Sequence, residues 1–390
     1  MDLNDRIRRR QRTGDDSPIV RDYESISPIS HVEEPSGRGP VLERLLDFLA
    51  PVFQEGMPTD AYVHGPPGSG KSAVMTALTA HLSRIVSGSP TVIHTTTRAP
   101  SGPVPAFVYV DARVATSPFA LYHTLLDAVT DERVPRQGVG TEWMRDRVHE
   151  SLRADQWRAI LVVDHLDEAD GLTLETLVDA VAPVESAVSW VGVGRRPPDR
   201  LDSELLPPER IEVPPYEKHT LAELLTARVS TGMAERAIDH EQIRRVADWA
   251  EGDAHDALSA TFGAADQAQT AGFSRVREQD LTAGMNAVPR PSMSLGRVHT
   301  LSLNRQLVLR RLIELDQAQS VDAAAQLISQ SHSIDLSRGT VKRFLYELAE
   351  TGIVERVSAK GRSGAGRPPS TLEPRFPTLV FRRLFDLEQP

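Results

Sequence analysis

Apolar residues along the chain gather in short continuous runs that alternate with stretches of helical periodicity. The run 159–163 has the composition of a fully buried parallel strand, and the runs 61–64, 107–111 and 188–193 predict further strands. Before the first strand, apolar side chains recur at helical spacing at Val41, Leu42, Leu45, Leu46 and Leu49. We therefore predict an α/β domain in which helices cover both faces of a parallel sheet.

The pattern changes at residue 215, after which helices without strands are predicted as far as a linker at 289–292. Beyond the linker, helical patterns are followed by a strand, a glycine-rich stretch and a returning strand. The polar, aperiodic N-terminus predicts a disordered arm. We therefore expect an arm at 1–30, a sheet domain at 31–214, a helical domain at 215–288 and a terminal domain at 298–390.

Length and composition indicate a multidomain cytoplasmic protein. A chain of 390 residues with 40% hydrophobic residues is long enough for two or three cores. It contains no cysteine, which excludes disulfides and thiolate metal sites. The charged N-terminus lacks the apolar segment of a secretion signal, and no window approaches the ~20 apolar residues of a membrane span. We expect no membrane partner.

A glycine-rich turn joins the strand at 61–64 to a predicted helix. Its sequence fits G-x-x-x-x-G-K-[ST] with the residues Gly65, Pro66, Pro67, Gly68, Ser69, Gly70, Lys71 and Ser72. Such a loop points backbone N–H groups at phosphate oxygens, and the following helix adds its positive end. Lys71 is expected to reach the β- and γ-phosphates of ATP. The first helical turn, Ala73, Val74 and Met75, completes the predicted site.

A carboxylate stands directly after the buried strand 159–163. Asp164 at this place is able to hold Mg²⁺ through water, opposite the hydroxyl of Ser72. The competing interpretation is an aspartate that merely ends a strand in a turn. Because the phosphate-binding loop lies upstream, we predict that Ser72 and Asp164 hold Mg²⁺ together.

With these motifs the chain resembles the archaeal DNA replication initiators, AAA+ proteins related to eukaryotic origin-recognition subunits and to the cell-division-cycle loader protein. The resemblance runs from about Gly37 to the C-terminus. Its motifs are Gly37-Arg38, the loop 65–72, Val110-Asp111-Ala112, Asp164-His165-Leu166-Asp167, the stretch 211–216 and the stretch 252–258. It implies an AAA+ parallel-sheet domain, a helical lid and a C-terminal winged helix-turn-helix.

The resemblance also assigns residues of the lid to the nucleotide. Tyr216 would lie near adenine and Arg228 would contact the nucleotide, as the matching tyrosine and arginine do in the family. The residues alone favour other roles, namely a tyrosine of the lid core and a solvated arginine on a helix. The family's arginine after Gly-Asp-Ala is His255 here, and His255 is therefore a further candidate for the ATP site.

Several positions depart from the family pattern. His165 follows Asp164 where the family has a glutamate that orients the attacking water, so Asp164 and His165 are the catalytic candidates. Gly194-Arg195 replaces the asparagine that senses the γ-phosphate, and 200–204 lacks a match for the arginine that acts in trans. Losing a transition-state arginine costs ~10³–10⁵ in rate. We therefore hypothesise that the protein binds ATP but hydrolyses it slowly or not at all.

Charge is distributed unevenly along the chain. The net charge is −10, yet residues 338–383 carry ten basic and four acidic side chains. The helix that Ser337 is predicted to cap buries an apolar face and exposes basic residues, and the glycine-rich tip that follows is also basic. Contacts with double-stranded DNA are predicted for Arg338, Lys342, Arg343, Lys360, Arg362 and Arg367.

Together these features predict an ATP-binding replication initiation protein that binds origin DNA. Other initiator subunits or a replicative helicase are further partners that the resemblance implies. Two alternatives stay open: a signalling-type ATPase that regulates transcription, and a winged helix that docks a partner protein. Binding at scattered promoters would favour the first alternative, and absence of DNA affinity at low salt would favour the second.

Overall fold

The computed structural model describes residues 18–54, 56–87, 105–130, 132–154, 158–166, 168, 171–315, 320–331, 334–358 and 370–389. The chain divides into two compact units. One unit spans His31–Tyr216, and the other combines the chain before His31 with the chain from Glu217 onward. No helix in the described part of the chain is long and apolar enough to cross a bilayer.

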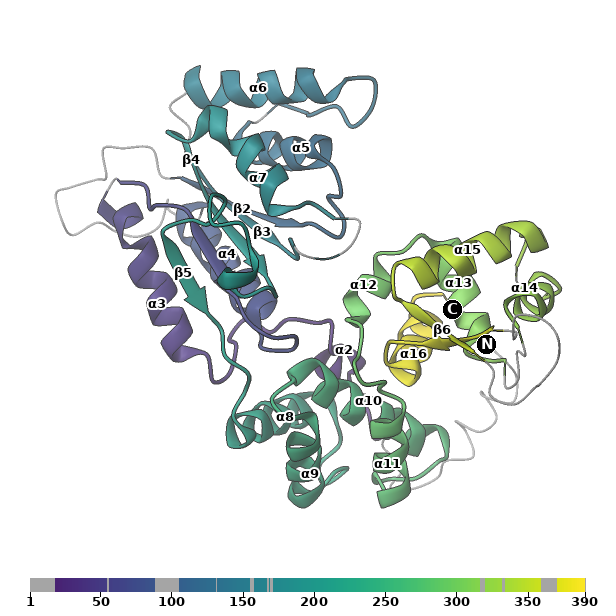
Figure 1. The fold of residues 1–390 in the computed structure, drawn as a ribbon. Helices are drawn as coiled ribbons and strands as arrows, with labels where there is room; N and C mark the ends of the chain where they lie inside the picture. The colour runs from purple at the N-terminus through teal and green to yellow at the C-terminus, as the bar shows by residue number, and fades with distance from the viewer. Residues whose placement is uncertain are drawn as a thin grey trace. The chain divides into compact units, whose positions relative to one another are not determined.

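The unit His31–Tyr216 is built on a five-stranded sheet in which all neighbours are parallel (Figure 1). In spatial order its strands are β2 (Ala106–Asp111), β3 (Ala159–Asp164), β4 (Val188–Gly194), β1 (Ala61–His64) and β5 (Glu209–Glu212). Asp111 pairs with Asp164, and His64 pairs with Gly194. The carboxyl ends of four neighbouring strands therefore meet at one edge of the sheet.

Helices cover both faces of this sheet, as the runs of apolar residues predict. One core lies between β2 and β3 and the helices α5 (Pro118–Val129), α6 (Thr141–Ala154) and α7 (Leu174–Val181). The other lies between the central strands and the helices α3 (Gly39–Leu49) and α4 (Lys71–Ser87). Strand β3 is buried on both sides, because Leu161 and Val163 enter the first core while Ile160 and Val162 enter the second.

The second unit begins with a helical part. Its helices are α8 (Lys218–Gly232), α9 (His240–Ala250), α10 (Ala254–Thr270) and α11 (Glu278–Asn286). Asp239 caps α9 in a capping box with Gln242, and Asp253 caps α10 by accepting a hydrogen bond from the N–H of Asp256. The strandless character predicted for this region is what the structure shows.

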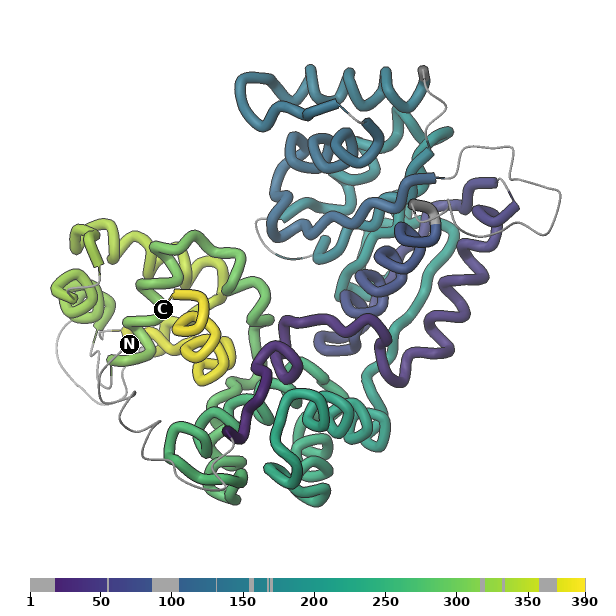
Figure 2. The backbone as a smooth tube through the Cα atoms, turned by 180° about the vertical axis from the view of Figure 1, so that it is seen from behind, coloured from purple at the N-terminus to yellow at the C-terminus, as the bar shows by residue number. Residues whose placement is uncertain are grey.

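The prediction of a disordered arm over 1–30 is wrong for residues 18–30; residues 1–17 lie outside the described part. The short helix α2 (Tyr23–Ile26) is capped by Asp22, and Val20 forms a bridge with Met233 at the end of α8. Figure 2 shows this N-terminal segment, in purple, beside the green helices of the same unit. Ile19, Val20 and Ile26 are buried. The segment orders because apolar residues distant in sequence cover it, a cause that local polarity does not reveal.

The terminal part of the second unit is a winged helix. Three helices, α13 (Leu303–Leu312), α14 (Val321–Ser329) and α15 (Arg338–Glu350), precede an antiparallel pair of strands, β6 (Val354–Ser358) and β7 (Ser370–Pro374). Ser337 caps α15 by accepting a hydrogen bond from the N–H of Thr340 at 3.2 Å. A short helix α12 (Leu295–His299) comes before this set, and α16 (Thr378–Glu388), which the sequence pattern did not predict, follows it.

Candidate nucleotide site and DNA-binding surface

The loop Gly65–Ser72 connects β1 to α4 at the edge where the strands end. Gly68 and Gly70 have φ values of 63° and 79°, a conformation that L-residues with side chains rarely adopt. A Cβ added at Gly65 would lie 2.1 Å from the carbonyl oxygen of Val213. The backbone is therefore curled and closely packed, as a loop that surrounds a phosphate requires.

The side chain of Lys71 lies inside the curve of this loop. Its ammonium donates hydrogen bonds to the carbonyl oxygens of Gly65 and Pro66, each at 2.8 Å, and to the hydroxyl of Ser69 at 3.3 Å. The residue is buried. A buried ammonium gains more from an anionic partner than from carbonyl dipoles, so these acceptors are ones that a phosphate would replace favourably.

Ser72 and Asp164 both lie close to the imidazole of His165. The carboxylate of Asp164 is buried and accepts hydrogen bonds from the Tyr109 hydroxyl at 2.8 Å and the His165 N–H at 2.7 Å. Ser72 Oγ lies 3.4 Å from His165 Nε2, which in turn lies 3.7 Å from Asp164 Oδ2. A hydroxyl and a carboxylate are donors that suit Mg²⁺, so the residues present fit the predicted cation.

His165 also contacts a charged pair, Glu168 and Arg195, that the sequence pattern does not reveal. Its Nδ1 lies 3.3 Å from Glu168 Oε1, and Arg195 donates to the same oxygen at 2.7 Å. Burial opposes ionisation of Glu168, but the hydrogen bond from His165 and the charge of Arg195 outweigh it and lower its pKa to about 2. Asp167, which the resemblance places in this segment, lies outside the described residues.

Tyr216 lies beside the phosphate-binding loop, where its hydroxyl would be 2.6 Å from a Cβ added at Gly70. The Arg38 guanidinium stacks 3.5 Å from the centroid of the Tyr216 ring and donates to the carbonyl of Pro214 at 3.0 Å. The motif Gly37-Arg38 includes this arginine, but the sequence pattern does not predict its contact with Tyr216. The pair fixes the ring next to the loop.

Arg228 binds the N-terminal segment of its own unit. Its guanidinium donates to the carbonyl of Ser27 at 2.6 Å and to that of Ser30 at 3.1 Å. Burial lowers the pKa of Arg228, and the charge of Asp22 partly offsets the effect. These contacts support a structural role, and its role at the nucleotide stays a prediction.

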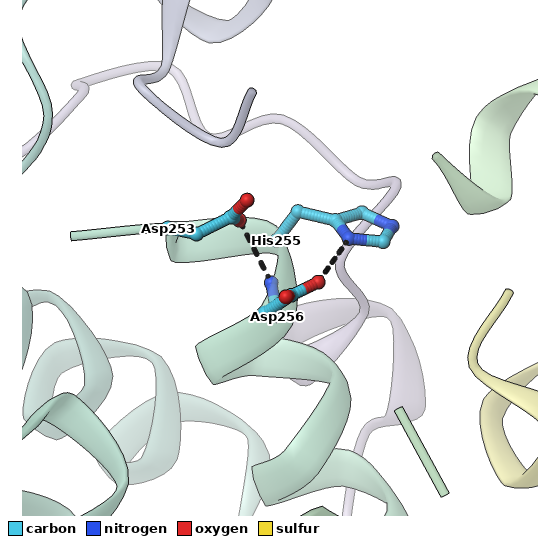
Figure 3. Close-up of side chains that lie close together, drawn as sticks. All are labelled: Asp253, His255 and Asp256. Atoms are coloured by element: carbon cyan, nitrogen blue, oxygen red, sulfur yellow. Dashed lines mark hydrogen bonds and ion pairs between the residues drawn. The ribbon is translucent and has the colours of Figure 1, made fainter. Parts of the chain in front are cut away.

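His255 belongs to a cluster with Asp253 and Asp256 at the start of α10 (Figure 3). Its Nδ1 lies 3.2 Å from Asp256 Oδ1, and its Nε2 accepts a hydrogen bond from the Leu295 N–H at 3.0 Å. Asp253 caps the helix by accepting a hydrogen bond from the Asp256 N–H. Because the positive end of a helix disfavours a cation, this position is unfavourable for a metal ion. Nε2 thus connects α10 with the start of α12, Nδ1 has its partner within α10, and nucleotide contact by His255 stays a prediction.

The basic face of α15 lies opposite its buried face. Val341, Phe344, Leu345 and Leu348 are buried as predicted, while Arg338 and Arg343 are exposed. Asp322 on α14 partly neutralises the helix, because it lies 2.9 Å from Lys342 Nζ and 3.5 Å from Arg338. Arg343 pairs with Glu347 at 3.5 Å. Lys360, Arg362 and Arg367 lie outside the described residues, so the predicted contacts of the tip remain predictions.

Comparison with known proteins gives consistent relationships. Residues 34–191 match the family described as "AAA ATPase domain". An "ORC1-type DNA replication protein" of Thermococcus onnurineus is 23% identical and covers 83% of this chain and 81% of its own length. An "ORC1-type DNA replication protein 1" of Aeropyrum pernix is 25% identical and covers 84% of this chain and 86% of its own length.

Solved structures give the same result for the fold. The Orc1 protein of Aeropyrum pernix, solved in complex with DNA, is 22% identical with a TM-score of 0.62, over 96% of this chain and 98% of that one. The Cdc6p protein of Pyrobaculum aerophilum is 19% identical with a TM-score of 0.54, over 95% and 100%. The chain is therefore similar along most of its length to the archaeal ORC1-type DNA replication proteins, and its residues 34–191 match the AAA ATPase domain family.

Proposed function

We propose that the protein is an ATP-binding DNA replication initiation protein whose winged helix binds origin DNA. The observation that carries this proposal is the union, in one chain, of a phosphate-binding loop with its cation ligands and a winged helix with a basic helix face. The similarity to ORC1-type proteins over 83% of the chain supports it, and so does the DNA complex of the Aeropyrum pernix Orc1 protein. Such a role places the protein with the chromosome, in the cytoplasm.

Three domains carry this function in our proposal. The base at 31–214 holds the nucleotide, residues 215–288 form the helical lid domain, and the winged helix at 298–390 binds the duplex. Loop N–H groups and Lys71 bind the phosphates, Ser72 and Asp164 hold Mg²⁺, and Tyr216 lies near adenine. When bound, Mg²⁺ neutralises the charge of the β- and γ-phosphate oxygens.

We also infer that hydrolysis is slow. His165 stands where a carboxylate would orient the attacking water, and Oε1 of the nearby Glu168 is already engaged by both His165 and Arg195. A single-turnover assay with excess protein, alongside an ATP-binding assay, tests this. We expect tight binding with little product formed. Rapid turnover that is abolished in Lys71→Ala would contradict the inference of slow hydrolysis, while the proposal that the protein binds ATP would stand.

Mapping the protein on genomic DNA with and without a functional ATP site tests the DNA role. We expect occupancy at a few intergenic regions with repeated sequences, weakened in Lys71→Ala. Occupancy at many promoters would instead favour transcriptional regulation. If purified protein has no affinity for duplex DNA even at low salt, where electrostatic binding is strongest, the winged helix does not bind DNA.

A further inference from the structure

Three potential ligand atoms converge at the C-terminal end of β3, beside the phosphate-binding loop. His165 Nε2 lies 3.4 Å from Ser72 Oγ and 3.7 Å from Asp164 Oδ2. Ligands on adjacent positions around a small divalent cation, each ~2.1 Å from it, lie about 3 Å apart. The separations from Nε2 are slightly wider than this and shorter than those of ligands on opposite sides. The separations of Nε2 from the two predicted cation ligands are therefore close to those of neighbouring ligands around one cation.

The tautomer of His165 directs a lone pair into this space. Glu168 Oε1 lies 3.3 Å from Nδ1, and a carboxylate oxygen accepts hydrogen bonds, so Nδ1–H is the donor there and Nε2 of the neutral imidazole keeps its lone pair. In this tautomer the Ser72 hydroxyl donates a hydrogen bond to Nε2, and a cation would take the place of that donor. Metal-binding histidines characteristically donate their second nitrogen to a carboxylate in this way.

Two further observations concern the same group of side chains. The φ of His165 is 65°, a left-handed conformation that non-glycine residues rarely adopt and that persists where the surrounding structure holds it. Within the described residues, Glu168 Oε2 is buried and accepts no hydrogen bond. A buried carboxylate oxygen of this kind has capacity for a donor such as cation-bound water.

We propose that His165 Nε2 is a direct ligand of the divalent cation that binds with the nucleotide, and that Glu168 positions it. A site with one imidazole nitrogen among its oxygens binds transition-metal ions such as Mn²⁺ better, relative to Mg²⁺, than a site with oxygens alone. The cation preference of this protein is therefore shifted toward Mn²⁺. The inference rests on the proposed function, since the cation accompanies a bound nucleotide.

Pulsed EPR on the full chain with Mn²⁺ and ADP tests the ligand directly. We expect nitrogen hyperfine coupling of a coordinated imidazole, and its change on labelling the histidines with ¹⁵N separates it from coupling to adenine. The coupling disappears in His165→Gln and persists in His81→Gln, a control in the same unit. Because the labelling experiment uses the unmutated protein, it holds even if a variant fails to fold.

Binding measurements test the preference and the positioning role. The ratio of the ADP dissociation constants in Mg²⁺ and Mn²⁺ should fall about 10-fold in His165→Gln, and Glu168→Ala should weaken Mn²⁺ binding about 10-fold. Glu168→Gln, which keeps an oxygen acceptor for Nδ1, should retain the nitrogen coupling. ADP binding without nitrogen coupling and with an unchanged ratio would overturn the inference. Failure to bind any nucleotide with either cation would instead refute the proposed function.

Discussion

Arg195 donates a hydrogen bond to Glu168 at 2.7 Å and so connects the end of β4 with the segment after β3. The side chain of Glu168 is 4% exposed, whereas that of Arg195 is 31% exposed. A carboxylate this deeply buried remains ionised because Arg195 and His165 compensate for its lost hydration. The stability of this edge of the sheet therefore depends on the negative charge of Glu168.

Replacing Glu168 with glutamine should make stability less dependent on pH. The pKa of Glu168 falls from 4.5 to about 2 on folding. Because the pKa of Glu168 is lower in the folded than in the unfolded protein, its charge stabilises the fold at pH values above the unfolded pKa. This contribution is lost as the pH falls from about 5 toward 2. It amounts to about 3 kcal/mol. Urea unfolding should show Glu168→Gln less stable than wild type at pH 7, with the difference shrinking toward pH 3. An equal difference at both pH values would show that the charge does not matter.

Removing the ammonium of Lys71 should weaken nucleotide binding without unfolding the protein. Each charge-assisted hydrogen bond to phosphate contributes about 1.5–3 kcal/mol, so Lys71→Ala should lose roughly 10- to 100-fold in affinity. A fluorescent ADP analogue measures this in titrations. Lys218→Ala is the matched control, because Lys218 is exposed and forms an ion pair with Asp248. Equal affinities in both variants would exclude phosphate binding by Lys71.

Most of the sheet domain could be predicted from the sequence because its signals are local. The continuous apolar run of β3 is buried on both faces, and the glycine pattern of 65–72 reflects φ values that the loop requires. The position of Asp164 follows from the same reasoning, since the strand ends where its apolar run ends. Both the strand and the loop are where the pattern placed them.

The contacts that were missed depend on chain segments distant in sequence. Glu168 and Arg195 are 27 residues apart and meet because β3 and β4 are parallel neighbours, which periodicity does not specify. The sequence alone favours a solvated helix position for Arg228, yet its guanidinium donates hydrogen bonds to backbone carbonyls about 200 residues away. The four-residue helix α2 is too short to show a periodic pattern.

Removing the carboxylate of Asp322 should strengthen DNA binding. Asp322 lies 2.9 Å from Lys342 and 3.5 Å from Arg338 and competes with phosphates for both cations. Asp322→Asn should therefore raise affinity for duplex DNA at low salt. Each cation freed for a phosphate adds ~0.9 to the slope of log K against log salt. Fluorescence anisotropy over a series of salt concentrations measures both effects.

Asp386→Asn provides the control for this prediction. Asp386 also pairs with an arginine of the winged helix, Arg310, but on α16 and α13 and not on the face of α15. Its neutralisation changes the net charge equally and should leave the salt slope unchanged. If both substitutions increase affinity to the same extent, total charge explains the effect and the face of α15 does not bind the duplex.

Truncating Ile26 should destabilise the second unit, because this residue of the N-terminal segment is fully buried. Its Cγ2 lies so close to Gly232 that a Cβ added there would be 2.8 Å away. Ile26→Ala should cost about 2–5 kcal/mol in the free energy of unfolding, the range for truncating large buried aliphatic side chains. Arg21→Ala is the control: that side chain is exposed, and the segment's contact with Gly232 at this point is made by the backbone. Urea unfolding compares the two variants. A difference within about 0.5 kcal/mol, typical of surface substitutions, would mean that residues 18–30 are not part of the folded unit.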